Sequence, residues 1–289
     1  MKNVQIPPAV NFHLWEPCNM RCKYCFATFQ DVKQTVLPKG HLPQDKAIQV
    51  VKQLADAGFQ KITFAGGEPT ICPWLYELIE TAHLAGLTTM IVTNGTQLST
   101  AWLEKFQSVL DWVTLSVDSL LTDTNLQIGR AITGKKVLSL EQYMQIVLAV
   151  KKANIRLKIN TVVSASNWEE DISSFIQFSK PERWKLFQVL PILGQNDACI
   201  QDFTISSEQF YSFVAKHQMH LPQIKIVAES NDLMTASYAM LDPAGRFFDN
   251  STGTYIYSEP TLEVGVKEAF QFVSFSEKKF NTREGRYNW

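Results

Sequence analysis

No apolar run in the 289-residue sequence is long enough to cross a membrane. A transmembrane helix needs about 20 consecutive apolar residues, so none is expected. The N-terminal stretch MKNVQIPPAVNF also lacks the basic region and the apolar region of a signal peptide. We therefore expect a cytoplasmic protein that does not bind a membrane.

The sequence also has no excess of positive or negative charge, since its formal net charge is −1. This balance argues against a protein that coats nucleic acid, and any anionic ligand must be held by local basic clusters. Cysteine is scarce, with five residues in a chain that has no secretion signal. The pattern predicts reduced thiols rather than a disulfide framework. Cys72 and Cys199 stand alone and are interpreted as small buried residues.

Strand-like and helix-like runs alternate along the first two thirds of the chain. Strands are predicted at 9–15, 61–67, 88–95, 112–119, 156–164 and 183–192. Amphipathic helices are predicted between them at 44–58, 73–86, 99–109, 139–153 and 168–178. Six β-then-α units with right-handed crossovers form a parallel sheet with the helices outside.

Polar residues follow directly after four consecutive predicted strands. Their positions help to decide whether the predicted sheet is open or curved into a partial barrel. In chain order they are the cysteines at 18–25, Gly66-Gly67-Glu68, Thr93-Asn94-Gly95, and Ser116 with Asp118. Barrel active sites use the carboxyl ends of many strands, whereas an open doubly wound sheet uses those beside its switch point. The sequence therefore predicts an α/β fold, a partial (β/α)6 TIM-type barrel over residues 1–200.

Residues 201–289 break this rhythm. They contain a predicted helix at 206–217, a strand at 224–230 and a hairpin around 241–249. We interpret them as a C-terminal α+β extension that caps the substrate site, rather than as an independent domain.

The stretch CNMRCKYC places Cys18, Cys22 and Cys25 in one loop after the first strand. Three thiolates at the spacing C-x3-C-x2-C reach three corners of a [4Fe–4S] cluster and leave one iron without a protein ligand. One alternative is a zinc site completed by His13 or His41, although zinc sites usually contain a second C-x2-C pair. A set of reduced thiols without a metal is the other alternative, and such clustered thiols oxidise readily.

This loop, with Tyr24 before its last cysteine and Gly66-Gly67-Glu68-Pro69 after the second strand, resembles the radical S-adenosylmethionine (SAM) enzymes. The resemblance implies two cofactors, a [4Fe–4S] cluster and SAM, whose amino and carboxylate groups chelate the open iron. Cleavage of SAM then supplies a 5′-deoxyadenosyl radical. The residues expected to contact the cofactor are Tyr24, Gly66, Gly67, Glu68, Asn94, Ser116 and Arg130. Glycine allows a close backbone approach, and Glu68 offers an acceptor for the SAM ammonium.

No cysteine follows Cys199, so a second iron–sulfur cluster in the extension is excluded. The stretches LDWVTLSVDS, IGRAITGKK, KINTVV, ERWKLFQVLPILGQN, ESNDLMTASYAMLD and GVKEAFQF resemble the viperin branch of the superfamily. The amphipathic membrane helix of vertebrate viperins is not found in this sequence, so a prokaryotic homologue is expected.

The viperin resemblance implies a ribonucleoside triphosphate substrate. The radical removes the ribose 4′ hydrogen, and the 3′ hydroxyl leaves as water. Uptake of an electron and a proton then gives the 3′-deoxy-3′,4′-didehydro nucleotide, which terminates viral RNA chains. The resemblance also implies an external electron donor of the flavodoxin or ferredoxin type, and we expect a monomer. No stretch of the sequence indicates which base is selected.

Basic residues suited to phosphate occur late in the chain. Lys158 and Asn160 alternate on the fifth strand and Lys185 lies in the sixth, so all three are expected to face the barrel interior. An inward lysine is costly unless it is paired, which favours an anionic ligand, with internal salt bridges as the alternative. The remaining predicted substrate contacts are Arg246, Arg283 and Arg286. The resemblance also implies that Tyr238 lies near the reacting ribose, and a catalytic role as hydrogen or proton donor is our hypothesis for it. A tyrosine packed in the core is the alternative.

Two other functions stay open on the sequence alone. The chain could be a radical SAM enzyme that acts on another small molecule or a peptide. It could instead be a zinc-stabilised binding module without catalysis, which iron content and colour would distinguish.

Overall fold

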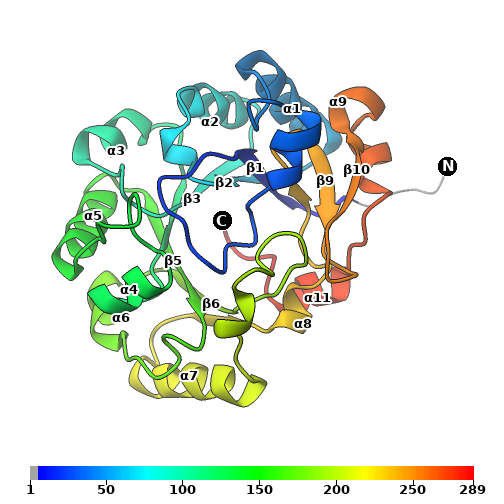
Figure 1. The fold of residues 1–289 in the computed structure, drawn as a ribbon. Helices are drawn as coiled ribbons and strands as arrows, with labels where there is room; N and C mark the ends of the chain where they lie inside the picture. The colour runs from blue at the N-terminus through cyan, green and yellow to red at the C-terminus, as the bar shows by residue number, and fades with distance from the viewer. Residues whose placement is uncertain (1–5) are drawn as a thin grey trace.

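The computed structural model describes residues 6–289 and contains one ten-stranded sheet, in the order β10-β9-β8-β1-β2-β3-β4-β5-β6-β7. Strands β1 to β7 run parallel, β8 is parallel to β1, and β9 and β10 are antiparallel additions. The strands curve around a centre (Figure 1), and within residues 6–289 no pairing joins β7 to β10. The partial barrel is therefore confirmed. The strands are β1 Ala9–Trp15, β2 Lys61–Gly66, β3 Thr88–Thr93, β4 Trp112–Ser116, β5 Arg156–Val163, β6 Arg183–Gln188, β7 Ile226–Glu229, β8 Met240–Leu241, β9 Arg246–Asp249 and β10 Ile256–Pro260.

Helices cover the outside of this sheet (Figure 1). Their starts follow the local chemistry, because Ser139 and Ser206 each form a capping box with a glutamine three residues later. The predicted helix at 168–178 begins only at Ser173, since the side chains of Asn167 and Asp171 bond nearby backbone N–H groups in turns. The helices are α1 Gln44–Ala57, α2 Leu75–Leu84, α3 Thr100–Phe106, α4 Thr122–Gln127, α5 Leu140–Lys152, α6 Ser173–Ser179, α7 Ser207–His220, α8 Asn231–Met234, α9 Thr261–Val264, α10 Val266–Phe270 and α11 Glu277–Thr282, with short turns of helix at η1 Val32–Val36, η2 Pro69–Ile71 and η3 Ile200–Asp202.

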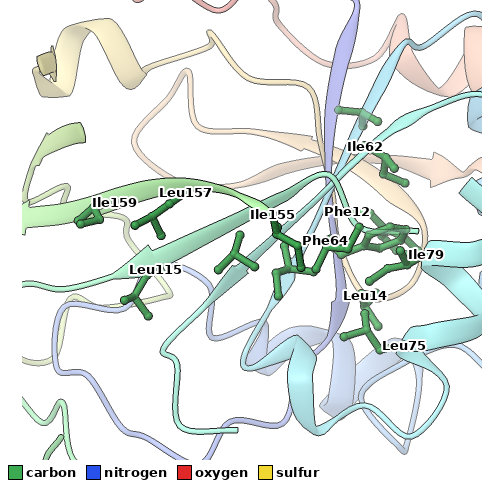
Figure 2. Close-up of a cluster of buried hydrophobic side chains, with 14 of the residues drawn as sticks. Phe12, Leu14, Ile62, Phe64, Leu75, Ile79, Leu115, Ile155, Leu157 and Ile159 are labelled. Carbon is green, nitrogen blue, oxygen red and sulfur yellow. The ribbon is translucent and has the colours of Figure 1, made fainter. Parts of the chain in front are cut away.

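Successive side chains of each strand point alternately to the helices and to the barrel interior. One set forms the hydrophobic core and the other lines the cavity. Figure 2 shows Phe12, Ile62 and Phe64 of the first two strands packed with Leu75 and Ile79 of α2. The residues between them on the strands point to the barrel interior, where most side chains are polar. The hydrophobic core thus lies between sheet and helices, and the inside of the barrel is free to bind a ligand.

The C-terminal segment contributes to the same sheet. β7 continues the parallel order beside β6, and β8 to β10 extend the opposite edge. The predicted boundary at residue 200 stays a prediction, and residues 1–5 of the predicted barrel segment lie outside the described residues. No helix within residues 6–289 has the length and apolar character needed to cross a membrane.

The chain ends at the centre of the ring of strands (Figure 1). The Tyr287 ring lies edge-on to Trp112 at 5.7 Å, and Arg156 donates a hydrogen bond of 2.9 Å to the Asn288 carbonyl. Trp112 and Arg156 are the first residues of β4 and β5. The tail therefore covers the amino-terminal end of the barrel, opposite the loops that carry the predicted motifs.

Candidate active site

A cavity of about 540 Å³ runs through the barrel from the cysteine loop to the C-terminal tail. It collects every predicted site residue except Arg246 and Arg286. The predicted residues that line it are Cys18, Cys22, Tyr24, Cys25, Gly66, Gly67, Glu68, Asn94, Ser116, Arg130, Lys158, Asn160, Lys185, Tyr238 and Arg283.

The cysteine loop is held by main-chain hydrogen bonds. Lys23 N–H donates to Ile128 carbonyl at 2.9 Å, and Cys25 N–H donates to Cys22 carbonyl at 3.1 Å. Burial raises the pKa of the Cys22 thiol to about 12 and that of Cys25 to about 11. A thiolate in this loop therefore needs a positive partner, which a bound metal centre supplies.

The three cysteines were weighed as ligands of a cluster and as ligands of a zinc ion completed by His13 or His41. Within residues 6–289 no three His, Cys, Asp or Glu side chains converge on one point as ligands of one ion do. His13 packs against the rings of Phe26 and Phe29, with its pKa lowered by burial to about 3, and His41 stacks on Trp15. Cys18, Cys22 and Cys25 line one cavity, and a cubane would bind each thiolate through a different iron. Both histidines weighed as a fourth zinc ligand thus pack against aromatic rings.

Gly66 and Gly67 are required by the chain's own backbone. A Cβ atom on Gly67 would lie 2.1 Å from the Glu16 carbonyl oxygen, and one on Gly66, at φ +151°, would lie 2.3 Å from that of Trp15. Any side chain here would push the start of the cysteine loop away from β2. The sequence analysis predicted that the backbone at these glycines approaches another group closely. In the structure that group is the main chain of residues 15–17.

Glu68 joins the ends of β2 and β3. Its Oε1 accepts hydrogen bonds from Thr70 N–H at 3.0 Å and from Thr93 Oγ1 at 2.7 Å, and its Oε2 accepts one from Asn94 N–H at 2.8 Å. The side chain is 1% exposed, and burial raises its pKa against the effect of these donors. The carboxylate thus fixes the turn, and Oε2 keeps capacity for a further donor.

We expect Glu68→Gln to weaken SAM binding about five- to tenfold without loss of the cluster. An amide NH2 would face N–H and O–H donors in place of one carboxylate oxygen, and a charge-assisted bond to the SAM ammonium would become neutral, a change of order 1 kcal/mol. Calorimetric titration with SAM, alongside iron and sulfide analysis, measures both effects. Glu77→Gln on the exposed face of α2 is the matched control. Unchanged SAM affinity in Glu68→Gln would remove Glu68 from the SAM site.

Asp118 is a site residue whose role the sequence did not indicate. Its Oδ2 accepts hydrogen bonds from Tyr24 OH at 2.8 Å and from Arg130 Nη1 at 2.9 Å, while Oδ1 accepts one from Val162 N–H at 2.8 Å. Arg130 also donates to the Ser116 carbonyl. One buried carboxylate therefore connects the cysteine loop, β4 and β5. Tyr24 and Arg130 came from the motif, but their common partner is visible only in the fold.

Asn94 is also held by a residue that the sequence analysis did not select. Its Nδ2 donates to Asn19 Oδ1 at 2.8 Å, and its own Oδ1 accepts from Thr96 N–H at 3.0 Å. Asn19 lies inside the cysteine loop, so this pair connects the loop to the end of β3. Asn94 thus takes part in a turn, and its contact with SAM stays a prediction.

Lys185 belongs to a buried polar group deeper in the barrel. Its Nζ forms an ion pair with Glu229 and donates to Tyr238 OH at 3.1 Å. Tyr238 OH donates to the other Glu229 oxygen at 2.5 Å, and the Arg283 guanidinium stacks 3.5 Å from the Tyr238 ring centre. The internal salt bridge weighed from the sequence is therefore present for Lys185. Glu229, at the end of β7, was not predicted because its partner is distant in sequence.

Lys158 and Asn160 have unused polar atoms in the same region. Lys158 is 7% exposed, and within residues 6–289 no side chain pairs with its ammonium group. Burial, followed by the charges of Lys185 and Lys61, lowers its pKa well below the usual value. Asn160 Oδ1 is buried and has no hydrogen-bond partner among these residues. Both groups face a cavity whose contents would complete them.

Lys61 is a further cation that the sequence analysis did not select. It donates to Tyr287 OH at 3.0 Å and lies over the rings of Tyr287 and Trp289 at 4.7 and 4.8 Å. The alternation KITFA in β2, with Lys61 and Thr63 facing inward, would have identified it. The positive charges of Lys61, Lys158, Lys185 and Arg283 lie close enough in this part of the barrel to act on one another.

Arg246 and Arg286 lie away from the cavity. The Arg246 guanidinium is bound by Asp242 and Asp31, where it attaches the loop after the cysteines to β9. Arg286 is exposed, whereas Arg283 is buried and donates to the Ser237 carbonyl. The structure thus separates the two predicted substrate contacts of the tail, and only Arg283 lines the cavity. The sequence analysis interpreted both Cys72 and Cys199 as buried. This is correct for Cys72 and wrong for Cys199, which is exposed.

The family model of the radical SAM superfamily matches residues 15–178, which include the cysteine loop and Gly66-Gly67-Glu68. The chain belongs to the radical SAM superfamily. Members of this superfamily use SAM and a [4Fe–4S] cluster, so membership implies both cofactors. The prediction made from two motifs is confirmed.

Two curated relatives define the branch of this radical SAM chain. It is 54% identical over 282 residues to the S-adenosylmethionine-dependent nucleotide dehydratase of Lacinutrix mariniflava, covering 98% of this chain and 59% of that protein. It is 52% identical to the protein of the same name from Flammeovirga pacifica, covering 98% of this chain and 97% of that one. The chain therefore belongs to the nucleotide dehydratase family, as the viperin resemblance predicted.

A solved structure agrees with the fold. The structure of anSMEcpe with bound AdoMet superposes with a TM-score of 0.68 at 15% identity, covering 93% of this chain and 84% of that one. At this identity the likeness supports the barrel architecture alone.

Proposed function

We propose that the chain is a SAM-dependent nucleotide dehydratase that converts a ribonucleoside triphosphate to its 3′-deoxy-3′,4′-didehydro analogue. The observation that carries this proposal is one cavity that joins the three-cysteine loop to a buried group of cations. The names of the relatives at 52% and 54% identity support it. We place the activity in antiviral defence, because such a product terminates RNA chains.

The carboxyl-terminal part of the cavity is the proposed cofactor site. Cys18, Cys22 and Cys25 would hold a [4Fe–4S] cluster, and with SAM this group supplies the radical that removes the ribose 4′ hydrogen. The protein orients SAM there through the main-chain turn that Glu68 fixes. The Arg130 guanidinium has a buried Nε without a partner among the described residues, which suits a carboxylate.

The middle and amino-terminal part of the cavity is the proposed nucleotide site. The strand register sets Ser116, Asn160 and Lys185 side by side across β4, β5 and β6, between the cofactor end and the cations. Lys158, Lys185 and Arg283 would bind the triphosphate, which neutralises charges that repel one another in the empty barrel. Tyr238 OH, held between Glu229 and Lys185, is the proposed donor of the final proton or hydrogen.

Product analysis under anaerobic, reducing conditions tests this function. The reconstituted enzyme is incubated with SAM and with ATP, GTP, CTP and UTP together. The expected result is one nucleotide lighter by a water molecule, with 5′-deoxyadenosine formed in proportion. SAM cleavage that leaves all four nucleotides intact would favour a radical SAM enzyme for another substrate. A colourless protein that contains zinc in place of iron would favour the binding module.

We expect the affinity for the nucleotide to fall as the pH rises above about 8. Burial lowers the pKa of Lys185 to about 8, so the Lys185 side chain of the empty site is protonated below this value and loses its charge above it. A bound polyanion raises this pKa again, and binding then takes up a proton, which costs affinity by at most about tenfold per pH unit. Nucleotide titrations between pH 7 and 9.5 measure the slope. Lys185→Arg should flatten it, and an equal slope in both proteins would contradict the assignment.

A further inference from the structure

Four exposed basic side chains lie in the cysteine loop or in the segment that contacts it. Arg21 and Lys23 flank Cys22 in the sequence, and Lys135 with Lys136 lies in a turn that follows Arg130. All four side chains are exposed to solvent. We refer to Arg21, Lys23, Lys135 and Lys136 as the basic rim.

Main-chain contacts bring the two parts of the basic rim together. Arg21 N–H donates to Gly129 carbonyl at 3.2 Å, and Thr133 N–H donates to Asn19 carbonyl at 2.9 Å. A Cβ atom on Gly129 would lie 2.2 Å from the Arg21 carbonyl oxygen, so the segments are in direct contact. The rim is therefore one surface, formed beside Cys22 by segments more than a hundred residues apart.

The charges of the rim are not used within the described part of the chain. None of the four residues forms an ion pair there. Arg21 also donates to the Met20 carbonyl at 2.8 Å and so supports the loop. Solvated lysines are common, but four unpaired cations around one metal-binding loop, in a chain of net charge −1, form a local field.

We propose that the basic rim is the docking surface for an acidic electron-carrier protein. This inference rests on the proposed function, because only a redox centre held by the three cysteines needs such a partner. Electron transfer weakens steeply with distance, so a carrier has to dock at the surface nearest the thiols, and Lys23 and Arg21 adjoin Cys22. Leu126, 41% exposed and bonded through its carbonyl to Gly129 N–H, adds an apolar contact beside the charges.

The test reverses the charge of the three lysines and leaves Arg21, which supports the loop. The rim variant carries Lys23→Glu, Lys135→Glu and Lys136→Glu. The control variant carries Lys46→Glu, Lys52→Glu and Lys278→Glu, which are exposed lysines of other helices, so both variants have the same net charge. An acidic flavodoxin is the probe, and its Kd for each reconstituted protein is measured by calorimetric titration at several salt concentrations without nucleotide.

We expect the rim variant to bind flavodoxin at least about tenfold more weakly than the wild type, with a smaller dependence on salt. The control variant should stay within about twofold. Equal affinities of the two variants, or no binding by the wild type, would overturn the proposal. Because no nucleotide is present, these outcomes do not depend on whether the nucleotide panel yields a product.

Reduction by a small molecule provides a second readout. SAM cleavage driven by flavodoxin should fall in the rim variant, whereas cleavage driven by dithionite should match the wild type, because dithionite needs no docking surface. If the rim variant lost both activities equally, the lysines would act on the cofactor site itself, and the docking proposal would be rejected. Iron and sulfide contents of the variants are compared in the same preparations.

Discussion

Replacing Cys18, Cys22 or Cys25 by alanine is expected to abolish SAM cleavage. Each thiolate would bind a different iron of the cubane, so the loss of one leaves a second iron without a protein ligand beside the one reserved for SAM. The loop is held by its main chain and by the Tyr24–Asp118 bond, so the barrel should stay folded. Formation of 5′-deoxyadenosine, iron content and the circular dichroism of each variant measure these effects.

The two other cysteines are matched controls for this prediction. Cys72 is buried beneath α2, and Cys199 is exposed in the loop after β6. Cys72→Ala should lower the thermal midpoint slightly by leaving a small cavity, and neither it nor Cys199→Ala should change SAM cleavage. A Cys22→Ala enzyme that formed 5′-deoxyadenosine at the wild-type rate would refute the cluster assignment.

The barrel and its cofactor end could be predicted because their signals are local. Strands of alternating or apolar residues, the cysteine spacing and the turn Gly66-Gly67-Glu68 are each contained in fewer than ten residues. The carboxyl ends of parallel strands meet at one face, so motifs that end successive strands are brought together by the topology alone. The same logic gave the inward direction of Lys158 and Lys185.

The partners of these residues could not be predicted, because they depend on packing between distant segments. Glu229 reaches Lys185 only because β7 pairs with β6, and Asp118 reaches Tyr24 only because the cysteine loop folds over β4. Arg246 looked available for phosphate in the sequence, but Asp242 and Asp31 occupy its guanidinium. Spacing could not separate Arg283 from Arg286 either, because the side chain of Arg283 is buried against the cavity and that of Arg286 is exposed to solvent.

The second large effect is expected from replacing Lys158, the buried lysine of the barrel for which the described residues provide no ion-pair partner. A buried ammonium group without a partner is unfavourable, and an apolar side chain of similar volume in its place is often neutral or stabilising. In the proposed function, the triphosphate is the partner of Lys158. Stability of the empty protein and affinity for the nucleotide should then respond to its removal in opposite directions.

We expect Lys158→Met to raise the nucleotide Kd about ten- to a hundredfold, because one charge-assisted contact to phosphate, of order 1.5–3 kcal/mol, is lost. The free energy of unfolding of the empty protein should be unchanged or higher, since methionine fills the space without a buried charge. Calorimetric titration with the accepted nucleotide and chemical denaturation measure the two quantities. Lys52→Met, on the exposed face of α1, should change neither. Unchanged nucleotide affinity in Lys158→Met would show that the triphosphate binds elsewhere, and a large loss of stability would show that Lys158 has a structural partner.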